Sequence, residues 1–387
     1  MRVTTKRSLM RLAVGFAIFG TFALPAGTAH AAPLVWRLVS TNISDTSPGL
    51  VGVSCTRPSQ CVGVGSQQAP GSGSLSQTLV EVWDGKSWSI VPSPDEGPND
   101  ANVLQSVSCS SRRSCVAVGY WCSSGCLENQ SLVEVFDGSV WAVVPSPDPG
   151  SRNQLNSVSC TSARSCTAVG GYCPEAGCPD GSYFKTLIET WNGTAVSLAS
   201  SPNPTTEDNI LSSVSCVSAA NCQAVGGGAS GGDFETLVES WNGTIWSATP
   251  SPNPGTDSVL LGISCVNANH CEAVGWMDAG LDVTPQRTLV ESWNGSGWSV
   301  VSSVSPGTGS DLLNSVSCIS ARRCVAVGVY ATGSVTPPPM QIWNGIRWSE
   351  ISGNVPNPNG GYDGLLCMSH SRCVVLDGDQ TLIGSRR

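Results

Sequence analysis

Short runs of alternating polar and apolar residues recur along the chain, separated by glycine, proline and asparagine. One stretch contains four such runs, at 213–216, 222–226, 236–241 and 246–249. Alternation over four to eight residues is typical of a half-buried strand, and the third run is also rich in residues that favour strands. The pattern therefore predicts units of four short β-strands.

Turn signals mark the ends of these runs. Asn242-Gly243 lies between the third and fourth runs, and this dipeptide strongly favours a hairpin turn. A proline-rich linker at 250–254 follows the fourth run. Because proline cannot continue a hydrogen-bonded ladder, each linker should end a four-stranded unit. The same turn recurs with a preceding aromatic, as Trp-Asn-Gly or its variants, at Trp83, Phe136, Trp191, Trp241, Trp293 and Trp343.

The phrase Ser-Val-Ser-Cys, followed by Cys-x-Ala-Val-Gly, recurs in seven approximate copies spaced 49 to 56 residues apart. Four-stranded units with this period are typical of a β-propeller, and a solenoid is the alternative. The last copy has three runs, at 365–367, 373–376 and 381–383, whereas residues 36–40 resemble an isolated fourth strand. A closed ring explains both, because the N-terminal strand would complete the last blade. The sequence therefore predicts an all-β fold, a seven-bladed propeller with four-stranded blades.

The first residues resemble a secretory signal peptide. Basic residues precede an apolar run at 12–24, and Ala29 and Ala31 form a small-x-small cleavage pattern. We predict that residues 1–31 are removed and that 32–387 form one secreted propeller domain. An uncleaved membrane anchor is the alternative, which the short run and Pro25 disfavour. No later segment is apolar enough to be expected to span a membrane.

The 18 cysteines are even in number and fall into pairs. Every repeat has a Cys-x5-Cys pair, and two further pairs lie in loops. An exported chain meets an oxidising compartment, which favours disulfides. Zinc binding is the alternative, but the spacing is not typical of zinc ligands and most pairs have no nearby histidine, so no metal is expected. The predicted pairs are Cys55–Cys61, Cys109–Cys115, Cys122–Cys126, Cys160–Cys166, Cys173–Cys178, Cys216–Cys222, Cys265–Cys271, Cys318–Cys324 and Cys367–Cys373.

The segments 222–228 and 237–246 together resemble a kelch repeat, with glycines after the second strand, an aromatic on the third and a tryptophan shortly after. Most units have one glycine where kelch repeats have two. The Asn-Gly turn is also similar to the Asp-box turn of sialidase-like propellers. Galactose oxidase, a secreted kelch-like enzyme, would imply a copper site with two His and two Tyr. His270 and His370 lie in different repeats, so neither copper nor another cofactor is expected.

The amino-acid composition disfavours several classes of protein. The net charge of −9 disfavours nucleic-acid binding, because the phosphate backbone would repel the chain. A hydrophobic fraction of 40% with 13 tryptophans is enough for a packed core and disfavours disorder. Charged residues make up only 12%, about half the share of an average soluble protein.

A carboxylate recurs on the third strand and is a candidate general acid or base. Because it is present in nearly every repeat, we predict instead that it accepts hydrogen bonds from the backbone or from Ser and Thr, and no catalytic residue is expected. Several arginines lie in the cysteine loops, where they form either a solvated rim or a site for an anionic polymer. The residues concerned are Glu81, Glu134, Glu189, Glu239, Glu291 and Gln341 for the third strand, and Arg57, Arg112, Arg113, Arg164, Arg322, Arg323 and Arg372 for the loops.

In a propeller the loops between second and third strands share one end of the blades with the proline-rich linkers. These loops vary in length and hold aromatics outside the repeat pattern, among linker carboxylates such as Asp95, Asp148 and Asp257. Rigid rings give large contact areas at low entropic cost. We predict a ligand-binding face formed by Tyr120, Trp121, Tyr172, Tyr183, Phe184, Phe234, Trp276 and Tyr330.

Three functions remain open from the sequence. A non-catalytic binding module for a glycan or a cell-surface protein is favoured, acting as a secreted monomer. A polysaccharide hydrolase or lyase is the second, and a structural protein of the cell envelope is the third. The absence of a His, Asp and Glu set that breaks the repeat favours binding over catalysis.

Overall fold

The structure is a computed structural model, and the first residue that it describes is Val35, at the start of the N-terminal strand. The described residues are 35–41, 49–68, 75–97, 100–123, 126, 128–176, 178–179, 183–278, 285–305, 309–330, 340–351, 355, 361–378 and 380–385. The predicted signal peptide lies outside them. The chain divides into Met1–Pro33 and Leu34–Arg387, and the description below concerns the second unit. Among the described residues, no helix has the length and apolar character to cross a membrane.

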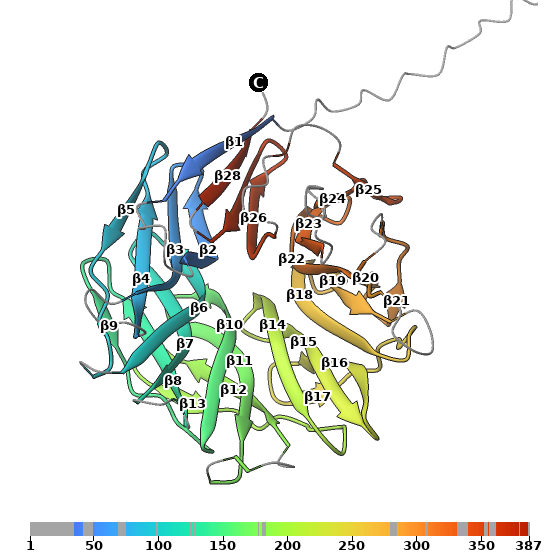
Figure 1. The fold of residues 1–387 in the computed structure, drawn as a ribbon, viewed down its shortest axis with the longest axis horizontal. Coiled ribbons are helices and arrows are strands. Elements are labelled where there is room, and N and C mark those ends of the chain that lie inside the picture. Colours follow the sequence, from blue (N-terminus) through green and yellow to red (C-terminus); the bar gives the residue numbers. More distant parts are fainter. Residues whose placement is uncertain are drawn as a thin grey trace, which may run out of the picture. The chain divides into compact units, whose positions relative to one another are not determined.

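Seven antiparallel sheets of four strands form the blades, numbered here in chain order (Figure 1). Blade 1 contains β2 (Gly49–Arg57), β3 (Gln60–Gln68), β4 (Ser76–Trp83) and β5 (Trp88–Val91); blade 2 contains β6 (Ala101–Ser111), β7 (Ser114–Cys122), β8 (Gln130–Phe136) and β9 (Trp141–Val143); blade 3 contains β10 (Arg152–Ser162), β11 (Ser165–Cys173), β12 (Lys185–Trp191) and β13 (Val196–Leu198). Blade 4 contains β14 (Asn209–Ser218), β15 (Asn221–Ser230), β16 (Asp233–Trp241) and β17 (Trp246–Ala248); blade 5 contains β18 (Ser258–Asn267), β19 (His270–Met277), β20 (Arg287–Trp293) and β21 (Trp298–Val300). Blade 6 contains β22 (Asp311–Ser320), β23 (Arg323–Tyr330), β24 (Met340–Trp343) and β25 (Trp348–Glu350); blade 7 contains β26 (Gly364–Ser369), β27 (Arg372–Asp377), β28 (Gln380–Ser385) and β1 (Val35–Ser40).

The N-terminal strand completes the last blade, as predicted. Strand β1 pairs antiparallel with β28, with Trp36 opposite Gly384 and Val39 opposite Thr381. Figure 1 shows β1 (blue) beside β28 (red). Blades 7 and 1 also join directly, because the amide of Leu50 donates to the carbonyl of Gly378 at 2.9 Å. The ring is closed, which excludes the solenoid. The first strands are longer than the alternating pattern indicated: β14 begins at Asn209, whereas the pattern began at residue 213.

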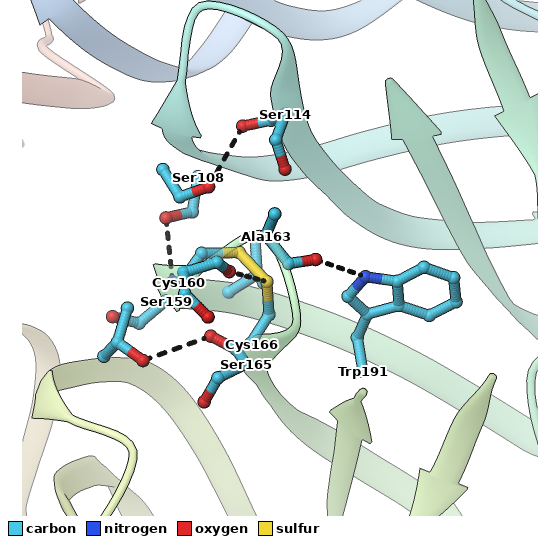
Figure 2. Close-up of a disulfide and its surroundings, with 12 residues drawn as sticks. Ser108, Ser114, Ser159, Cys160, Ala163, Ser165, Cys166 and Trp191 are labelled. Atoms are coloured by element: carbon cyan, nitrogen blue, oxygen red, sulfur yellow. Dashed lines mark hydrogen bonds between the residues drawn. A yellow bond between two sulfur atoms is a disulfide. The ribbon is translucent and has the colours of Figure 1, made fainter. Parts of the chain in front are cut away.

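The Ser-Val-Ser-Cys phrase links neighbouring blades. The last serine of one blade accepts a hydrogen bond from the cysteine amide of the next, as Ser108 does from Cys160 at 2.9 Å (Figure 2). Blade 7 has Leu366 at this serine position, so its link to blade 1 is made differently. The six serine links are Cys109–Ser54, Cys160–Ser108, Cys216–Ser159, Cys265–Ser215, Cys318–Ser264 and Cys367–Ser317, at 2.9 to 3.0 Å.

Apolar side chains are buried between blades. One cluster combines Val64 and Val80 of blade 1 with Leu104, Leu132 and Trp141 of blade 2. The fourth-strand tryptophans are the largest members of these clusters, and Trp88 is only 1% exposed. Burying one such side chain contributes roughly 2–3 kcal/mol. The fourth-strand tryptophans therefore form part of the core between blades.

All nine predicted disulfides are present. The repeated pairs join directly opposed residues of the first and second strands, such as Cys160 and Cys166 (Figure 2). No free cysteine occurs among the described residues. The cysteine framework therefore fixes the inner hairpin of each blade.

Candidate binding face and its linkers

The blades present two ends with different loops. At one end, which we call the turn face, the cysteine turns lie against the Asn-Gly turns. Trp191 donates its Nε1–H to the carbonyl of Ala163 at 3.2 Å (Figure 2), and a Cβ added to Gly193, whose φ is +93°, would lie 2.5 Å from Arg164. This turn therefore requires glycine both for its backbone conformation and for its packing.

At the other end, which we call the variable face, the loops between second and third strands contact the linkers. The carboxylate of Asp208 accepts a 2.8 Å hydrogen bond from the amide of Phe184, and the carboxylate of Glu207 accepts from the amides of Gly231 and Gly232. The loops fall at the two ends as the sequence predicted.

The linkers attach each blade to the next through the recurring glutamate. Ser93, in the linker after blade 1, donates to Oε2 of Glu134 in blade 2 at 2.6 Å. Ser201 makes the same bond to Glu239 at 2.7 Å. In blade 6 the amide side chain of Gln341 replaces the carboxylate and bonds the backbone of Val304. Equivalent serine–glutamate bonds join Ser146 to Glu189 and Ser251 to Glu291.

These glutamates are buried, and their pKa values are raised to between about 7 and about 8. Burial raises the pKa of Glu134 to about 8, although the Ser93 hydrogen bond opposes the shift. The pKa of Glu189 is raised by burial to about 8, and those of Glu239 and Glu291 to about 7. All four are at most 1% exposed. The prediction that these carboxylates accept hydrogen bonds from serine side chains is confirmed.

A second linker residue, two positions after the serine, attaches the linker to its own blade. Oδ1 of Asp95 accepts from the amide of Thr78, at the start of the third strand, at 2.8 Å. Asp148 accepts in the same way from Ser131 at 2.8 Å, and burial raises the pKa of this carboxyl. The sequence places these carboxylates beside the predicted binding aromatics, and the structure engages both in hydrogen bonds within the fold. Amides and a hydroxyl replace them in the pairs Asn203–Thr186, Asn253–Thr236 and Ser305–Thr288.

The predicted ligand-binding aromatics are spread over blades 2 to 6. Tyr183 and Phe234 are the most exposed, at 43% and 44%. Trp121 and Tyr172 are half-buried and pack against the clusters between blades. The ring contacts found among the described residues join the third- and fourth-strand aromatics of one blade, and none joins these candidates. Tyr120, Phe184 and Trp276 are half-buried, and Tyr330 ends β23, with its side chain outside the described set.

The central channel is a polar cavity of about 290 Å³ lined by the first strands. Its amide side chains bond across seams: Asn156 donates to the carbonyl of Leu211 at 2.8 Å and Asn314 to that of Tyr362 at 3.2 Å. Asp363 is the one charged residue in the described lining, and burial raises its pKa. Within the described ranges, no group of three His, Cys, Asp or Glu side chains is placed to hold a metal ion. The channel polar groups thus serve mainly to join the blades.

Comparison with known proteins identifies the fold. No protein-family model matches the sequence, and comparison with curated proteins gives no match. The chain is similar in structure to YCF48 bound to D1 peptide, with 11% identity, a TM-score of 0.57, and coverage of 92% of this chain and 100% of that one. It is also similar to YCF48 from Cyanidioschyzon merolae, with 14% identity, a TM-score of 0.57, and coverage of 90% and 98%. These likenesses establish the seven-bladed propeller fold, while the kelch and Asp-box resemblances stay predictions.

Proposed function

We propose that this protein is a secreted, non-catalytic propeller, kelch-like in its repeat pattern, that binds a cell-surface protein through its variable face. The observation that carries the proposal is the construction of that face in blades 2 to 4. Exposed rings stand on loops or at strand ends held in place by carboxylates; Phe234, near the start of β16, is held by Asp257, whose Oδ1 accepts from the Phe234 amide at 2.6 Å. Extra disulfides stiffen the loops of blades 2 and 3. Rings on a rigid support lose little entropy on binding.

Two further observations support binding over catalysis. The recurring glutamates, which are the carboxylates best suited to general acid–base chemistry by number and pKa, are buried and bonded to linkers. The structurally similar YCF48 was determined with a peptide bound. A propeller of similar fold can therefore bind a peptide, and our proposal is that this chain also binds one.

A glycan is the second candidate ligand, favoured by the exposed rings of Tyr183 and Phe234. Sugars stack on such rings, and the neighbouring linkers carry the half-buried carboxylates Glu207, Asp208 and Asp257. Cleavage of a polysaccharide by the purified domain would contradict the non-catalytic proposal.

The test applies purified residues 32–387 to a glycan array and to an array of random dodecapeptides. We expect binding on one array that weakens at least about tenfold in the double variant Tyr183→Ser, Phe234→Ser. Ile346→Ser is the matched control, because Ile346 is 85% exposed but lies on the turn face. Equal loss in both variants, or binding unaffected by either, would contradict recognition through the variable face. Light scattering of the same sample checks the predicted monomer.

A further inference from the structure

The seam between blades 1 and 2 departs from the repeat at the turn face. In blades 3 to 6 the third strand ends in a tryptophan whose Nε1–H donates to an alanine carbonyl in the cysteine turn. Blade 2 has Phe136 in place of that tryptophan and Arg112 in place of that alanine. Blade 1 keeps Trp83 but has Pro58 in the turn. Trp83 is 2% exposed, and its Nε1 has no hydrogen-bond partner among the described residues.

The smaller ring leaves space between the blades. In the next seam Trp191 packs against the apolar cluster between blades 2 and 3, as do Val135 and Val144 of the preceding blade. Phe136 takes the corresponding place against blade 1 and does not fill it. Two cavities open beside it, of about 440 and 500 Å³, and they share the lining residues Val62, Val82 and Phe136. Together they form one groove, which we call the seam groove.

The two parts of the seam groove differ in chemistry. The part toward the turn face is lined by Arg57 and Arg112, both exposed, together with Gln60 and the acidic Asp84. The Asp84 carboxylate already accepts hydrogen bonds from the amides of Lys86 and Ser87, at 2.8 and 2.9 Å, which lower its pKa. Arg57 and Arg112 are the cationic donors in the described lining of this part of the groove.

The other part of the groove is apolar. Its lining includes Val91, Pro92, Phe136, Trp141 and Val140, of which Val140 is 60% exposed. An apolar cavity beside paired arginines is complementary to a ligand that carries an aromatic or aliphatic side chain next to carboxylates. Extended peptides present such side chains a few ångströms apart, whereas polysaccharides lack the apolar group.

We propose that the seam groove binds an acidic peptide segment of a partner protein, with an apolar side chain against Phe136 and Val140 and carboxylates on Arg57 and Arg112. Paired guanidinium–carboxylate hydrogen bonds fix the orientation of the segment, and burial of its apolar side chain supplies most of the affinity. The groove extends from the turn face along the outer side of the seam to the linker residues Pro92, Ser93 and Pro94, and none of the predicted variable-face aromatics is in its described lining.

The test measures binding of a fluorescent hexapeptide with a central Phe-Asp-Asp sequence to residues 32–387 by anisotropy. We expect saturable binding that weakens at least about tenfold when asparagines replace the aspartates or serine replaces the phenylalanine. Arg57→Ala and Arg112→Ala should each weaken binding, whereas Arg164→Ala, which removes an exposed arginine from the cysteine turn of blade 3, should not.

The decisive variant is Phe136→Trp, which restores the residue of blades 3 to 6 and should fill the groove. We expect it to fold normally, as checked by circular dichroism, and to lose the peptide at least about tenfold. Equal effects of Arg57→Ala and Arg164→Ala would indicate attraction to the charge of the whole face and would overturn the proposal. Heparin is added as a competitor in the same assay. If heparin displaces the peptide from the wild type and binds the wild type and Phe136→Trp with equal affinity, the surface would be assigned to an anionic polymer instead. No binding of the aspartate peptide at millimolar concentration would also refute it.

Discussion

Ser93 in the linker after blade 1 donates a 2.6 Å hydrogen bond to Glu134 on the third strand of blade 2. The bond joins residues 41 positions apart, and its equivalents recur at three further seams. The glutamate is buried, so the linker serine is one of its few available partners. The linkers are therefore part of the interface between blades, and their sequence determines how neighbouring blades attach.

We expect the folded domain to lose stability as the pH rises from 5 to 8. Glu134 and Glu189 have folded-state pKa values raised to about 8, and Glu239 and Glu291 to about 7, against an ordinary value of 4.5. Between these limits the folded protein binds more protons than the unfolded chain, so higher pH favours unfolding. The contribution is full below about pH 4.5 and is lost as the pH passes through 7 to 8. Thermal unfolding at both pH values measures it.

The pH dependence should shrink in Glu189→Gln, because Gln341 shows that the blade accepts an amide at this position. Glu350→Gln is the control, since Glu350 is exposed on a fourth strand. A domain more stable at pH 8 than at pH 5, or an equal effect of both variants, would contradict the assignment of neutral buried carboxyls.

Removing a linker serine should destabilise the ring. Ser251→Ala takes away the hydrogen-bond donor of Glu291 and leaves a buried carboxyl without that partner, which costs about 1–3 kcal/mol. Ser299→Ala, an exposed serine of the same blade, should change the free energy of unfolding by less than about 0.5 kcal/mol. Urea denaturation measures both, and equal values would show that the linker bond contributes nothing.

The fold was predictable because every repeat has the same pattern of strands and turns. The first and last segments of the chain contain different strands of one incomplete blade. Residues 36–40 matched a fourth strand that the last repeat lacks, and the pairing of Trp36 with Gly384 follows. The disulfides were predictable for a similar reason, since cysteines at one spacing recur in every hairpin. The role of the recurring glutamates was also predicted, although their serine partners were not named.

The linker chemistry was harder to predict from the sequence. Asp95 and Asp148 look like free surface carboxylates when met one at a time, and only the pairing with Thr78 and Ser131 shows their role. The signal was present, because Asn, Asp or Ser recurs two positions after each linker serine. The seam groove depends on packing between two blades, which no single repeat encodes. The one sign of the groove in the sequence is Phe136, which stands at the position where blades 1 and 3 to 6 have tryptophan.

The closing strand should be essential for stability. Trp36 is 8% exposed and packs in the cluster of blades 6 and 7 with Val375 and Leu382. Trp36→Ala should therefore cost about 3–5 kcal/mol by leaving a cavity. Leu38→Ser is the control, because Leu38 on the same strand is 40% exposed and should have a small effect. Calorimetry distinguishes them, and a similar melting temperature for both variants would mean that β1 adds little to the closed ring.

The two kinds of disulfide should differ in their effect on stability. Cys216–Cys222 closes the inner hairpin of blade 4, and replacing both cysteines by serine should lower the free energy of unfolding by roughly 2 kcal/mol by the loop-entropy estimate. Cys122–Cys126 joins the last residue of β7 to the loop that follows it on the variable face. Its loss should affect ligand binding there more than unfolding, because Cys126 is exposed and the buried Cys122 belongs to none of the apolar clusters found between the described blades. Urea denaturation and array binding of the two double variants test this contrast. If the hairpin variant lost binding and the loop variant lost stability, the assignment of framework and binding-face disulfides would be wrong.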